Sequence, residues 1–496
     1  MKEKSRVYEE VKEGDWEKTP ASVKRLVEKQ AQVIKELEAQ QEELLEKLNR
    51  TSKNSSSPPS KDGLDVEKKA GKKGSGKKRG GQPGHQGFGR VLYEESECEE
   101  VIDHKPEKCS GCGEKLEGED EEPYRHQIVE IPPISPIVIE HRLHQLDCAV
   151  CGAKTRAKLP EDVCGSGYGI RVVAMVALLS SMYRHSQRMV QKAMAEIFNI
   201  TISLGTVNKL RMEASRAVEN AVAEAKIYIQ QAEVVGADET SFVQGNIDGC
   251  NQKNSQAWLW VAVTPLVTFF QITLTRCTDS AKNLLGEAFS GMLTSDRYAS
   301  YNWVDLERRQ LCWAHLKREF TKIAERTGVS QQIGNVLLEQ QEKLFKLWYQ
   351  VRDGTLKRCD FQLAVGEIRQ TIKSCLEEAA KYEIGSKEKT PLAKTVRTCR
   401  QLLKFEPALW LFVTAEGVEP TNNAAERAIR PAVIWRRTSF GSQTQAGSTF
   451  VQRMLTVVTT LKSQRRNVLE FITNCVQATR DGQPTPSLLP KSPVAD

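Results

Sequence analysis

Three acidic residues, far apart in the sequence, stand where they could bind metal ions together. Asp238 and Asp296 each follow a short apolar run typical of a buried strand. Glu426 lies about one turn into a predicted helix that Thr421 or Asn422 can cap. Neighbouring carboxylates repel one another unless a cation neutralises them, and two hard divalent cations can activate an attacking oxygen and stabilise a leaving one. The pattern predicts phosphoryl transfer with two Mg²⁺ ions, for which Mn²⁺ can substitute.

The acids can meet only if the elements before them form a sheet of the right order. The predicted order is strand, strand, strand, helix, strand, helix, strand, which is that of a ribonuclease-H-like mixed α/β core. In that topology the first and fourth strands are neighbours, so Asp238 and Asp296 would project together. Alternation along the strand should turn Glu239 to the opposite face. The predicted strands are Val234–Phe242, Ala257–Val263, Leu266–Leu274, Met292–Ser295 and Gln310–Ala314, and the first helix is Ser280–Phe289.

Four further residues are candidates for a supporting role. His315 follows the last predicted strand and can face a scissile phosphate, although a buried structural histidine is the commoner outcome. Asn423, Arg427 and Arg430 flank Glu426 on its helix. The alternative for this segment is an ordinary exposed, capped helix with internal ion pairs.

Five short runs, distributed over almost the whole chain, carry a family resemblance: Gly80–His85, Ala237–Thr240, Ser295–Tyr298, Cys312–His315 and Asn422–Arg427. In type and order they resemble the signatures of the insertion sequence 66 family of DDE transposases. The resemblance implies that Asp238, Asp296 and Glu426 are the catalytic triad. It also implies that the partners are DNA, at the terminal inverted repeats of an element and at a target, with small accessory proteins of the same element.

Composition sets broad limits on the class of protein. The 496 residues are enough for several domains, and the net charge of +7 favours a polyanionic partner. No apolar stretch is long enough to span a membrane, and the N-terminus does not resemble a signal peptide. The 13 cysteines, mostly single, favour a reducing cytoplasm in which the paired ones hold metal.

Residues 22–50 contain no Gly or Pro and carry a heptad pattern. We expect a weak coiled coil and therefore a homo-oligomer; the alternative is a single amphipathic helix packed on its own protein. The two heptad positions are occupied by Val27, Ile34, Gln41 and Leu48, and by Gln30, Leu37 and Leu44.

Residues 52–95 are rich in Ser, Pro, Gly and Lys and include the run Gly81–His85. Such a segment cannot bury enough apolar surface to fold alone. We expect a flexible tether that neutralises DNA phosphates, with a merely solubilising linker as the alternative. The basic residues proposed to contact DNA are Lys72, Lys73, Lys77, Lys78 and Arg79.

Two Cys-x-x-Cys pairs, Cys109 with Cys112 and Cys148 with Cys151, are each followed by a glycine that permits a tight knuckle. A hairpin of 125–131 and 137–146 is predicted to bring them together as a four-thiolate, structural Zn²⁺ ribbon. Disulfides are the alternative, which a reducing compartment disfavours.

The region 165–230 is predicted to be helical. Two helices, at 188–198 and 203–214, resemble a helix-turn-helix whose second helix starts with Ser203 as its cap. A plain helical hairpin is the alternative. The residues proposed to contact DNA are Thr206, Lys209 and Arg211.

Helix-forming residues fill 316–418, which predicts an all-helical insertion before the acid-bearing helix. Pro431 is expected to end that helix, so that Arg436 and Arg437 would lie on a basic loop fit for phosphates. The predicted domains are 1–51 coiled coil, 52–95 basic linker, 96–164 zinc ribbon, 165–230 helical DNA-binding region, 231–315 first part of the catalytic core, 316–418 insertion, 419–482 second part of the core, and 483–496 disordered tail.

The sequence therefore predicts a cytoplasmic, multidomain α+β DDE transposase that cleaves DNA and transfers the cut strand. One alternative is a nuclease of the same fold that does not join strands. The other is a non-catalytic zinc-ribbon DNA-binding protein derived from a transposase.

Overall fold

A computed structural model describes residues 16, 18–55, 90–160, 163 and 165–490. The chain divides into two compact units, Met1–Gly63 with Val138–Asp496, and Leu64–Ile137, and each is treated by itself. Most of the predicted basic tether, including the five basic residues proposed to contact DNA and the run 81–85, lies outside the described residues. None of the described helices is long and apolar enough to cross a membrane.

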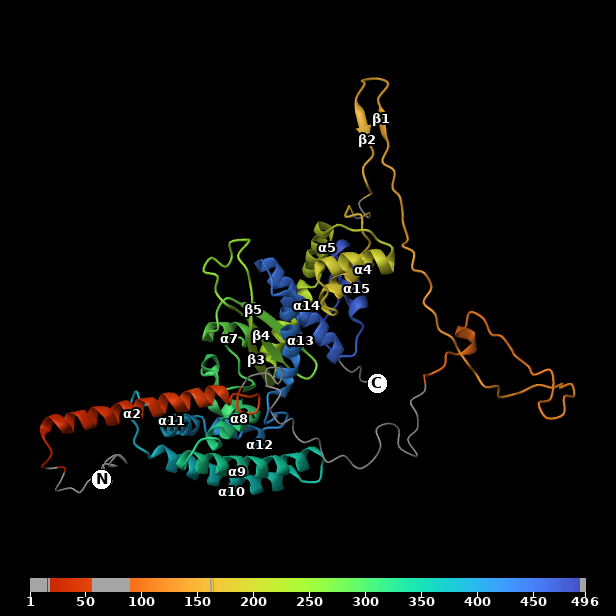
Figure 1. Cartoon of the computed structure of the whole chain (residues 1–496). Helices are drawn as coiled ribbons and strands as arrows, with labels where there is room; N and C mark the ends of the chain where they lie inside the picture. The colour runs from red at the N-terminus through yellow and green to blue at the C-terminus, as the bar shows by residue number, and fades with distance from the viewer. Residues whose placement is uncertain (1–15, 17, 56–89, 161–162, 164, 491–496) are drawn as a thin grey trace. The chain divides into compact units, whose positions relative to one another are not determined.

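A five-stranded mixed sheet lies at the centre of the larger unit (Figure 1). Its order is β5-β4-β3-β6-β7; β3, β4 and β5 are antiparallel neighbours, whereas β6 and β7 run parallel to β3. The prediction that the first and fourth strands lie side by side is confirmed, because Val234 pairs with Met292. The strands are β3 Val234–Phe242, β4 Ala257–Val263, β5 Thr268–Thr273, β6 Met292–Ser295 and β7 Arg309–Leu311.

The last strand is shorter than predicted. β7 stops at Leu311, and Trp313 already begins helix α8 (Trp313–Ala324) with Cys312 as its N-cap. The predicted helix between the last two strands is reduced to two 3-10 turns, Ala299–Tyr301 and Leu306–Arg308. His315 is therefore a residue of the first turn of a helix.

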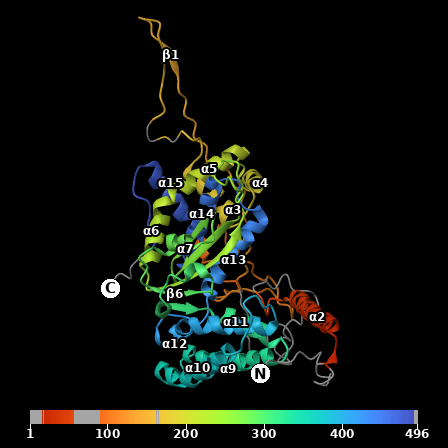
Figure 2. The same ribbon diagram turned by 90° about the vertical axis from the view of Figure 1, so that its left-hand side faces the viewer.

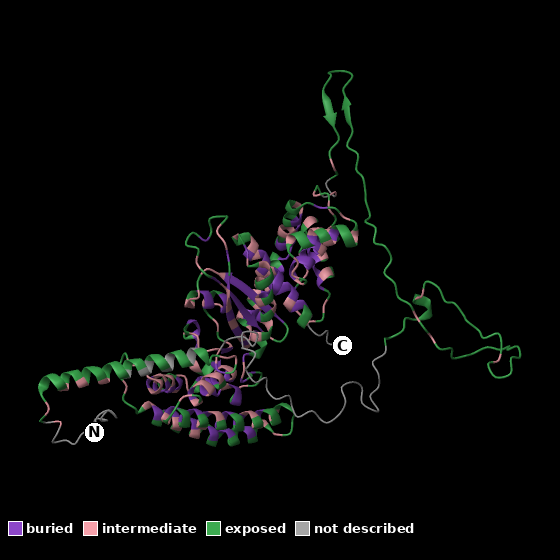
Figure 3. Ribbon diagram, in the orientation of Figure 1, coloured by how far each residue is buried: buried purple, intermediate pink, exposed green. Residues whose placement is uncertain are grey.

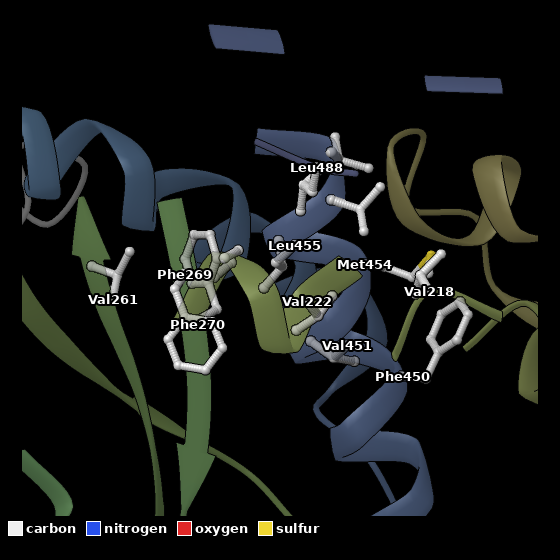
Figure 4. Packing of buried hydrophobic residues seen from close by; sticks show 14 of the residues in the cluster. Val218, Val222, Val261, Phe269, Phe270, Phe450, Val451, Met454, Leu455 and Leu488 are labelled. Atoms are coloured by element: carbon white, nitrogen blue, oxygen red, sulfur yellow. The ribbon is translucent and has the colours of Figure 1, made fainter. Parts of the chain in front are cut away.

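Helices complete the sheet at its faces and at one edge. α13 (Asn423–Ser439) packs across β3 and β4, and α7 (Thr278–Leu285) packs against β4. α14 (Gln445–Ser463) runs along the outer edge of β5, where Figure 4 shows Phe269 close to Leu455.

The contact of α14 with β5 satisfies the amides of an edge strand. The backbone N–H groups of Thr268, Phe270 and Ile272 donate to side-chain oxygens of α14, at 3.0, 3.0 and 2.9 Å. The acceptors are Thr460, Thr456 and Gln452. Four helical residues rise about 6 Å and two strand residues about 6.8 Å, so the two spacings match. The outward-facing amides of Thr268, Phe270 and Ile272 on this edge strand are therefore paired and not open.

The helical region before the sheet is not an independent core. α3 (Ile170–Ser181) and α5 (Leu204–Ala217) pack against α15 (Val468–Arg480) from the far end of the chain (Figure 2). Together with α4 (Gln187–Phe198) and α6 (Glu219–Gln231), they share one hydrophobic cluster with the sheet. Both predicted helices of the helix-turn-helix exist, and the Ser203 hydroxyl caps α5 by accepting from the Thr206 N–H.

The predicted helical insertion is present and has its own hydrophobic cluster, which includes Trp313, Trp348 and Phe361. Its helices after α8 are α9 Val329–Arg352, α10 Arg358–Ala380, α11 Pro391–Lys404 and α12 Leu411–Thr414.

Two predictions about the C-terminal part are wrong. α13 continues through Pro431 to Ser439, because proline removes only one amide donor while the face with Ile429 and Trp435 stays buried. The residues 483–490, predicted to be disordered, pack onto the larger unit: Leu488 is fully buried and its N–H donates to Glu224. The rest of the predicted tail lies outside the described residues.

Near the N-terminus, α2 (Ala21–Leu48) forms one helix of 28 residues over the predicted coiled-coil segment. Figure 3 shows it mostly exposed, and its exposed side chains include Leu26, Leu37 and Leu44. Self-association through this helix stays a prediction.

Candidate catalytic and metal-binding site

The first candidate acid lies on the face of β3 that contacts α13. Gly236, Asp238 and Thr240 alternate onto this face, and Arg436 of α13 donates to the Thr240 hydroxyl at 2.9 Å. A Cβ atom at Gly236 would lie only 3.0 Å from Oδ1 of Asn422. Glycine at this position therefore lets the start of α13 approach the strand closely.

Asn422, immediately before α13, anchors that helix to the middle of β3 and to the residue that follows β7. Its Nδ2 donates to the Ala237 carbonyl at 2.7 Å, and its backbone N–H donates to the Cys312 sulfur at 3.2 Å. The Cys312 N–H in turn donates to the Ser295 carbonyl at 2.9 Å. Glu426, one turn into α13, is thereby held beside the middle of β3 and the end of β6.

Asp296, directly after β6, lies in a turn organised by a buried arginine. The Arg309 guanidinium is inaccessible to solvent and donates to the Asp296 carbonyl at 2.8 Å, to Asn302 at 2.9 Å and to the Ser295 hydroxyl at 3.2 Å. The Asp296 carboxylate itself accepts from the Tyr298 N–H at 2.8 Å. The turn is fixed, and the second oxygen of Asp296 accepts no hydrogen bond from the described residues.

The three acids interact electrostatically. Burial raises the pKa of Asp238 to about 8, and the charge of Glu239 adds to this. Asp296 and Glu426 act on Asp238 in the same direction. Burial also raises the pKa of Glu426, and its Oε1 is a buried atom without a hydrogen-bond partner in the described part of the chain. Carboxyl groups gathered in one place are the donor set that a hard divalent cation requires.

Two residues of α8 lie next to Glu426. His315 Nδ1 is 3.7 Å and Arg318 Nη2 is 3.9 Å from Glu426 Oε1. Burial lowers the pKa of His315 to about 4, and Arg318 contributes to this, so the imidazole is neutral at neutral pH. His315 thus lies beside Glu426 as an uncharged group, and its contact with a phosphate stays a prediction.

Glu239 faces the other side of the strand, as alternation predicts. It accepts from the Tyr301 hydroxyl at 2.6 Å and pairs with Arg276 at 2.6 Å. The Arg276 guanidinium lies over the rings of Trp258 and Tyr298, at 4.5 and 3.6 Å from their centroids. This acid is buried with its own partners.

The other predicted site residues of α13 differ in whether they are exposed or bound to the sheet. Asn423, Arg427 and Arg430 are exposed around the first turns, and both arginines lower the pKa of Glu426 without overcoming burial. Arg436 is bound to β3, whereas Arg437 is exposed. Both lie on the helix and not on the predicted loop.

In the helix-turn-helix region, Lys209 is exposed and Thr206 is half-buried at the start of α5. Arg211, predicted to contact a groove of DNA, instead has its guanidinium 4.2 Å from the ring centroid of Phe450 on α14. Burial lowers the pKa of Arg211 to about 10. A side chain in this position packs the core and does not reach a groove.

Each cysteine pair forms a knuckle. The Gly113 N–H donates to the Cys109 carbonyl, and the Gly152 N–H donates to the Cys148 carbonyl, at 2.9 and 2.8 Å. Both glycines have positive φ, of 80° and 73°, so the predicted role of these glycines is confirmed. Hydrogen bonds from the backbone of Cys112 and Cys151 lower the pKa of Cys109 and Cys148 respectively.

The knuckles belong to different units, and the predicted hairpin between them is absent. Residues 125–131 and 137–144 form no strand; the observed pair is β1 (Gln145–Asp147) with β2 (Lys154–Arg156), which flanks the second knuckle. The prolines between the predicted strands remove amide donors, and tight turns favour pairing around the knuckle instead. A four-thiolate site stays a prediction.

Sequence reasoning missed three residues of the site. Asn422 was considered only as a helix cap, Arg309 was not considered, and Cys312 was placed in the predicted strand 310–314 with no role of its own. The Cys-x-x-His spacing of Cys312 and His315 at a strand–helix junction was the available signal. Arg309 has no local signal, because its partners are assembled only by the fold.

Comparison with protein families identifies three regions. The model of the transposase IS66 family matches residues 166–449, more than half of the chain. The zinc-finger binding domain of transposase IS66 matches 106–152, and a family of unknown function (DUF6444) matches 10–91.

Two proteins of Sinorhizobium fredii (strain NBRC 101917 / NGR234), both described as uncharacterized, are similar to the chain. Protein y4qI is 27% identical over 279 residues, which cover 52% of this chain and 49% of the relative. Protein y4hP is 24% identical over 392 residues, which cover 74% of this chain and 69% of the relative. The chain thus spans about half the length of one curated relative and about two thirds of the other.

The match to the IS66 family begins before α3 and ends within α14, so it includes the whole sheet and the helix that carries Glu426. The adjoining zinc-finger match contains both cysteine knuckles, which supports a structural zinc and a role in binding DNA. By its sequence, this chain belongs to the IS66 family of transposases.

Proposed function

We propose that the protein is a DDE transposase that binds the ends of an insertion sequence and catalyses metal-dependent DNA cleavage and strand transfer. The observation that supports this most is the position of Glu426. It is separated from the strands by the helical insertion, yet it interacts electrostatically with Asp238 and Asp296. The strand order is consistent with a ribonuclease-H-like core.

In this proposal Asp238, Asp296 and Glu426 hold two Mg²⁺ ions, or Mn²⁺ as a substitute. The fit rests on the all-oxygen donor set, the buried Glu426 Oε1 without a partner and the raised pKa of Asp238. When bound, the ions supply the positive charge that activates an attacking oxygen and stabilises a leaving one. Asp238 must lose its proton to act as a ligand.

The chain's own residues orient the reacting groups. Arg309 fixes the turn of Asp296, and Asn422 fixes the start of the helix that bears Glu426. Arg427 and Arg430, exposed beside Glu426, attract the DNA phosphates. Neutral His315 offers an uncharged imidazole to a phosphate oxygen, so it adds no repulsive charge to the cation set.

DNA is the proposed partner along several surfaces. Thr206 and Lys209 on α5 and Arg437 on α13 face solvent at least in part, and the basic segment 72–79 adds non-specific attraction. We include structural zinc in the finger region, self-association through α2, accessory proteins of the element and a cytoplasmic location.

Strand transfer distinguishes the proposal from its alternatives. Purified protein is incubated with short duplexes of the element ends, a target plasmid and Mg²⁺, and cleaved and joined products are counted separately. We expect both products, and their loss in Asp296→Asn. Asp353→Asn, which removes an exposed acid at the end of α9, is the matched control and should keep both.

Cleavage without joining would instead favour the nuclease alternative. Equal activity of Asp296→Asn and the unmodified protein would contradict the catalytic assignment. Binding of the ends without any cleavage would favour the non-catalytic alternative.

A further inference from the structure

A second group of metal-binding side chains borders the acid cluster. One donor atom each of Cys312, His315 and Glu426 lies within 4.8 Å of the other two. The group combines a thiol, an imidazole and a carboxylate, whereas the set proposed for Mg²⁺ contains carboxylates alone. Glu426 is common to both.

The local structure explains why these donors converge. Cys312 is the N-cap of α8 and His315 lies in its first turn, so both side chains start from the same end of the helix. The Asn422 N–H donates to the Cys312 sulfur, and the amides of Ala314 and His315 also lower the pKa of this thiol. Burial outweighs them and raises the pKa of Cys312. The start of α8 and the residue before α13 therefore hold the three donor side chains together.

Two of the three donors have no hydrogen-bond partner. His315 Nδ1 and Glu426 Oε1 are buried atoms that find no partner among the described residues. A buried polar atom without a partner costs free energy, and a native protein keeps one where function requires it. A cation between the two atoms would satisfy both.

The donor types select the ion. Thiolate and imidazole are ligands of Zn²⁺, and three protein ligands with an open fourth position form a common zinc geometry, whereas Mg²⁺ prefers oxygen. We propose that Cys312, His315 and Glu426 form a Zn²⁺ site whose occupation withdraws Glu426 from the Mg²⁺ set and inhibits the enzyme. The inhibition rests on the proposed function; the binding of zinc does not.

One neighbouring charge makes this site weaker than a four-cysteine site. Arg318 Nη2 lies 3.9 Å from Glu426 Oε1 and competes with a cation for that oxygen. Zinc at this site should therefore exchange, while zinc in the finger stays bound. The same pocket would hold either a hard ion set that supports catalysis or a soft ion that blocks it.

Zinc content tests the site without any measurement of activity. The full chain is equilibrated with excess Zn²⁺, freed of unbound metal by rapid gel filtration and analysed for zinc. We expect about two ions per chain in the unmodified protein and about one in Cys312→Ser, because the other ion belongs to the finger. Cys359→Ser, at an exposed position of α10, and Asp238→Asn should both keep about two.

Equal zinc content in Cys312→Ser and the unmodified protein would overturn the site. A missing finger zinc would lower both values by one and leave the difference intact. If thermal melting shows that Cys312→Ser does not fold, His315→Gln gives the same comparison.

The inhibitory role has a separate test. Mg²⁺-dependent cleavage is measured at increasing Zn²⁺, and each variant is expressed relative to its own activity without zinc. Cys312→Ser should need at least about tenfold more zinc for half-inhibition. If both proteins are equally sensitive to zinc while their zinc contents still differ, the inhibitory role alone is overturned. If the unmodified protein does not cleave DNA, the result counts against the proposed function instead.

Discussion

Asp238 and Glu239 are adjacent acids on β3, but their side chains lie on opposite faces of the sheet and have different neighbours. Glu239 is almost fully buried and has two partners, Arg276 and the Tyr301 hydroxyl. Asp238 faces two other acids. Burial raises its pKa to about 8, and the charge of Glu239, followed by those of Asp296 and Glu426, adds to this. A buried acid with partners contributes to the structure, whereas a buried acid among acids is kept at a cost in stability. The comparison agrees with a structural role for Glu239 and with the functional role proposed for Asp238.

Replacing Asp238 should produce the largest effect on activity and the opposite effect on stability. Asp238→Asn removes a proposed metal ligand, and we expect at least about a thousandfold loss of strand cleavage. A folded-state pKa above the unfolded value of 3.8 means that this carboxyl favours folding below pH 3.8 and loses that contribution as pH rises through about 8. With chelator at pH 8, Asp238→Asn should therefore be more stable by about 1–2 kcal/mol.

Denaturant unfolding of both proteins with chelator, and again with Mg²⁺, measures this. A less stable Asp238→Asn in chelator would contradict the functional assignment of this face. Added Mg²⁺ should stabilise the unmodified protein more than the variant.

Replacing Glu239 should mainly affect stability. Glu239→Gln leaves Arg276 without its charged partner, and because that guanidinium is partly exposed and stacked on two rings, we expect a loss of about 2–3 kcal/mol. Tyr301→Phe, which removes only the second partner, should cost less. Unfolding curves give the free energies, and cleavage per folded molecule should fall far less than in Asp238→Asn. A comparable loss of activity in a well-folded Glu239→Gln would erase the distinction between the faces.

We expect the smallest effect from replacing Asn422, which connects the start of α13 to β3. Asn422→Ala leaves the buried Ala237 carbonyl without its donor, which should cost about 1–2 kcal/mol. Because the helix start loosens, the Mg²⁺ concentration for half-maximal cleavage should rise several-fold, and high Mg²⁺ should restore much of the rate. Asn474→Ala, an exposed position on α15, is the control. A loss of stability with an unchanged Mg²⁺ requirement would limit Asn422 to a structural role.

The strands and two of the acids could be predicted because their signals are local. β4 has the predicted bounds, and Asp296 follows a short apolar run that is indeed a strand. The turn between β4 and β5 follows from Pro265, which ends one run before the next begins.

The contacts that close the site could not be predicted, because they join distant segments. Asn422 reaches Cys312 and Ala237 over more than one hundred residues, and no local pattern encodes such pairs. At Pro431 the local preference gave a wrong prediction. Proline favours a helix end, but α13 continues beyond it because Trp435 is buried on the same helix. For Arg211, a basic residue on a candidate recognition helix, packing against Phe450 decided the outcome.

The hydrogen bonds between side chains of α14 and amides of β5 affect the order in which the chain can fold during synthesis. The hydroxyls of Thr456 and Thr460 that satisfy the edge strand leave the ribosome almost two hundred residues after it. α15, which completes the packing of α3 and α5, emerges later still. A chain cut short before these helices would expose a bare strand edge and strip the first helices of their support. Such fragments should be cleared by proteolysis, so a truncated copy of the gene would make a poor competitor of the full protein.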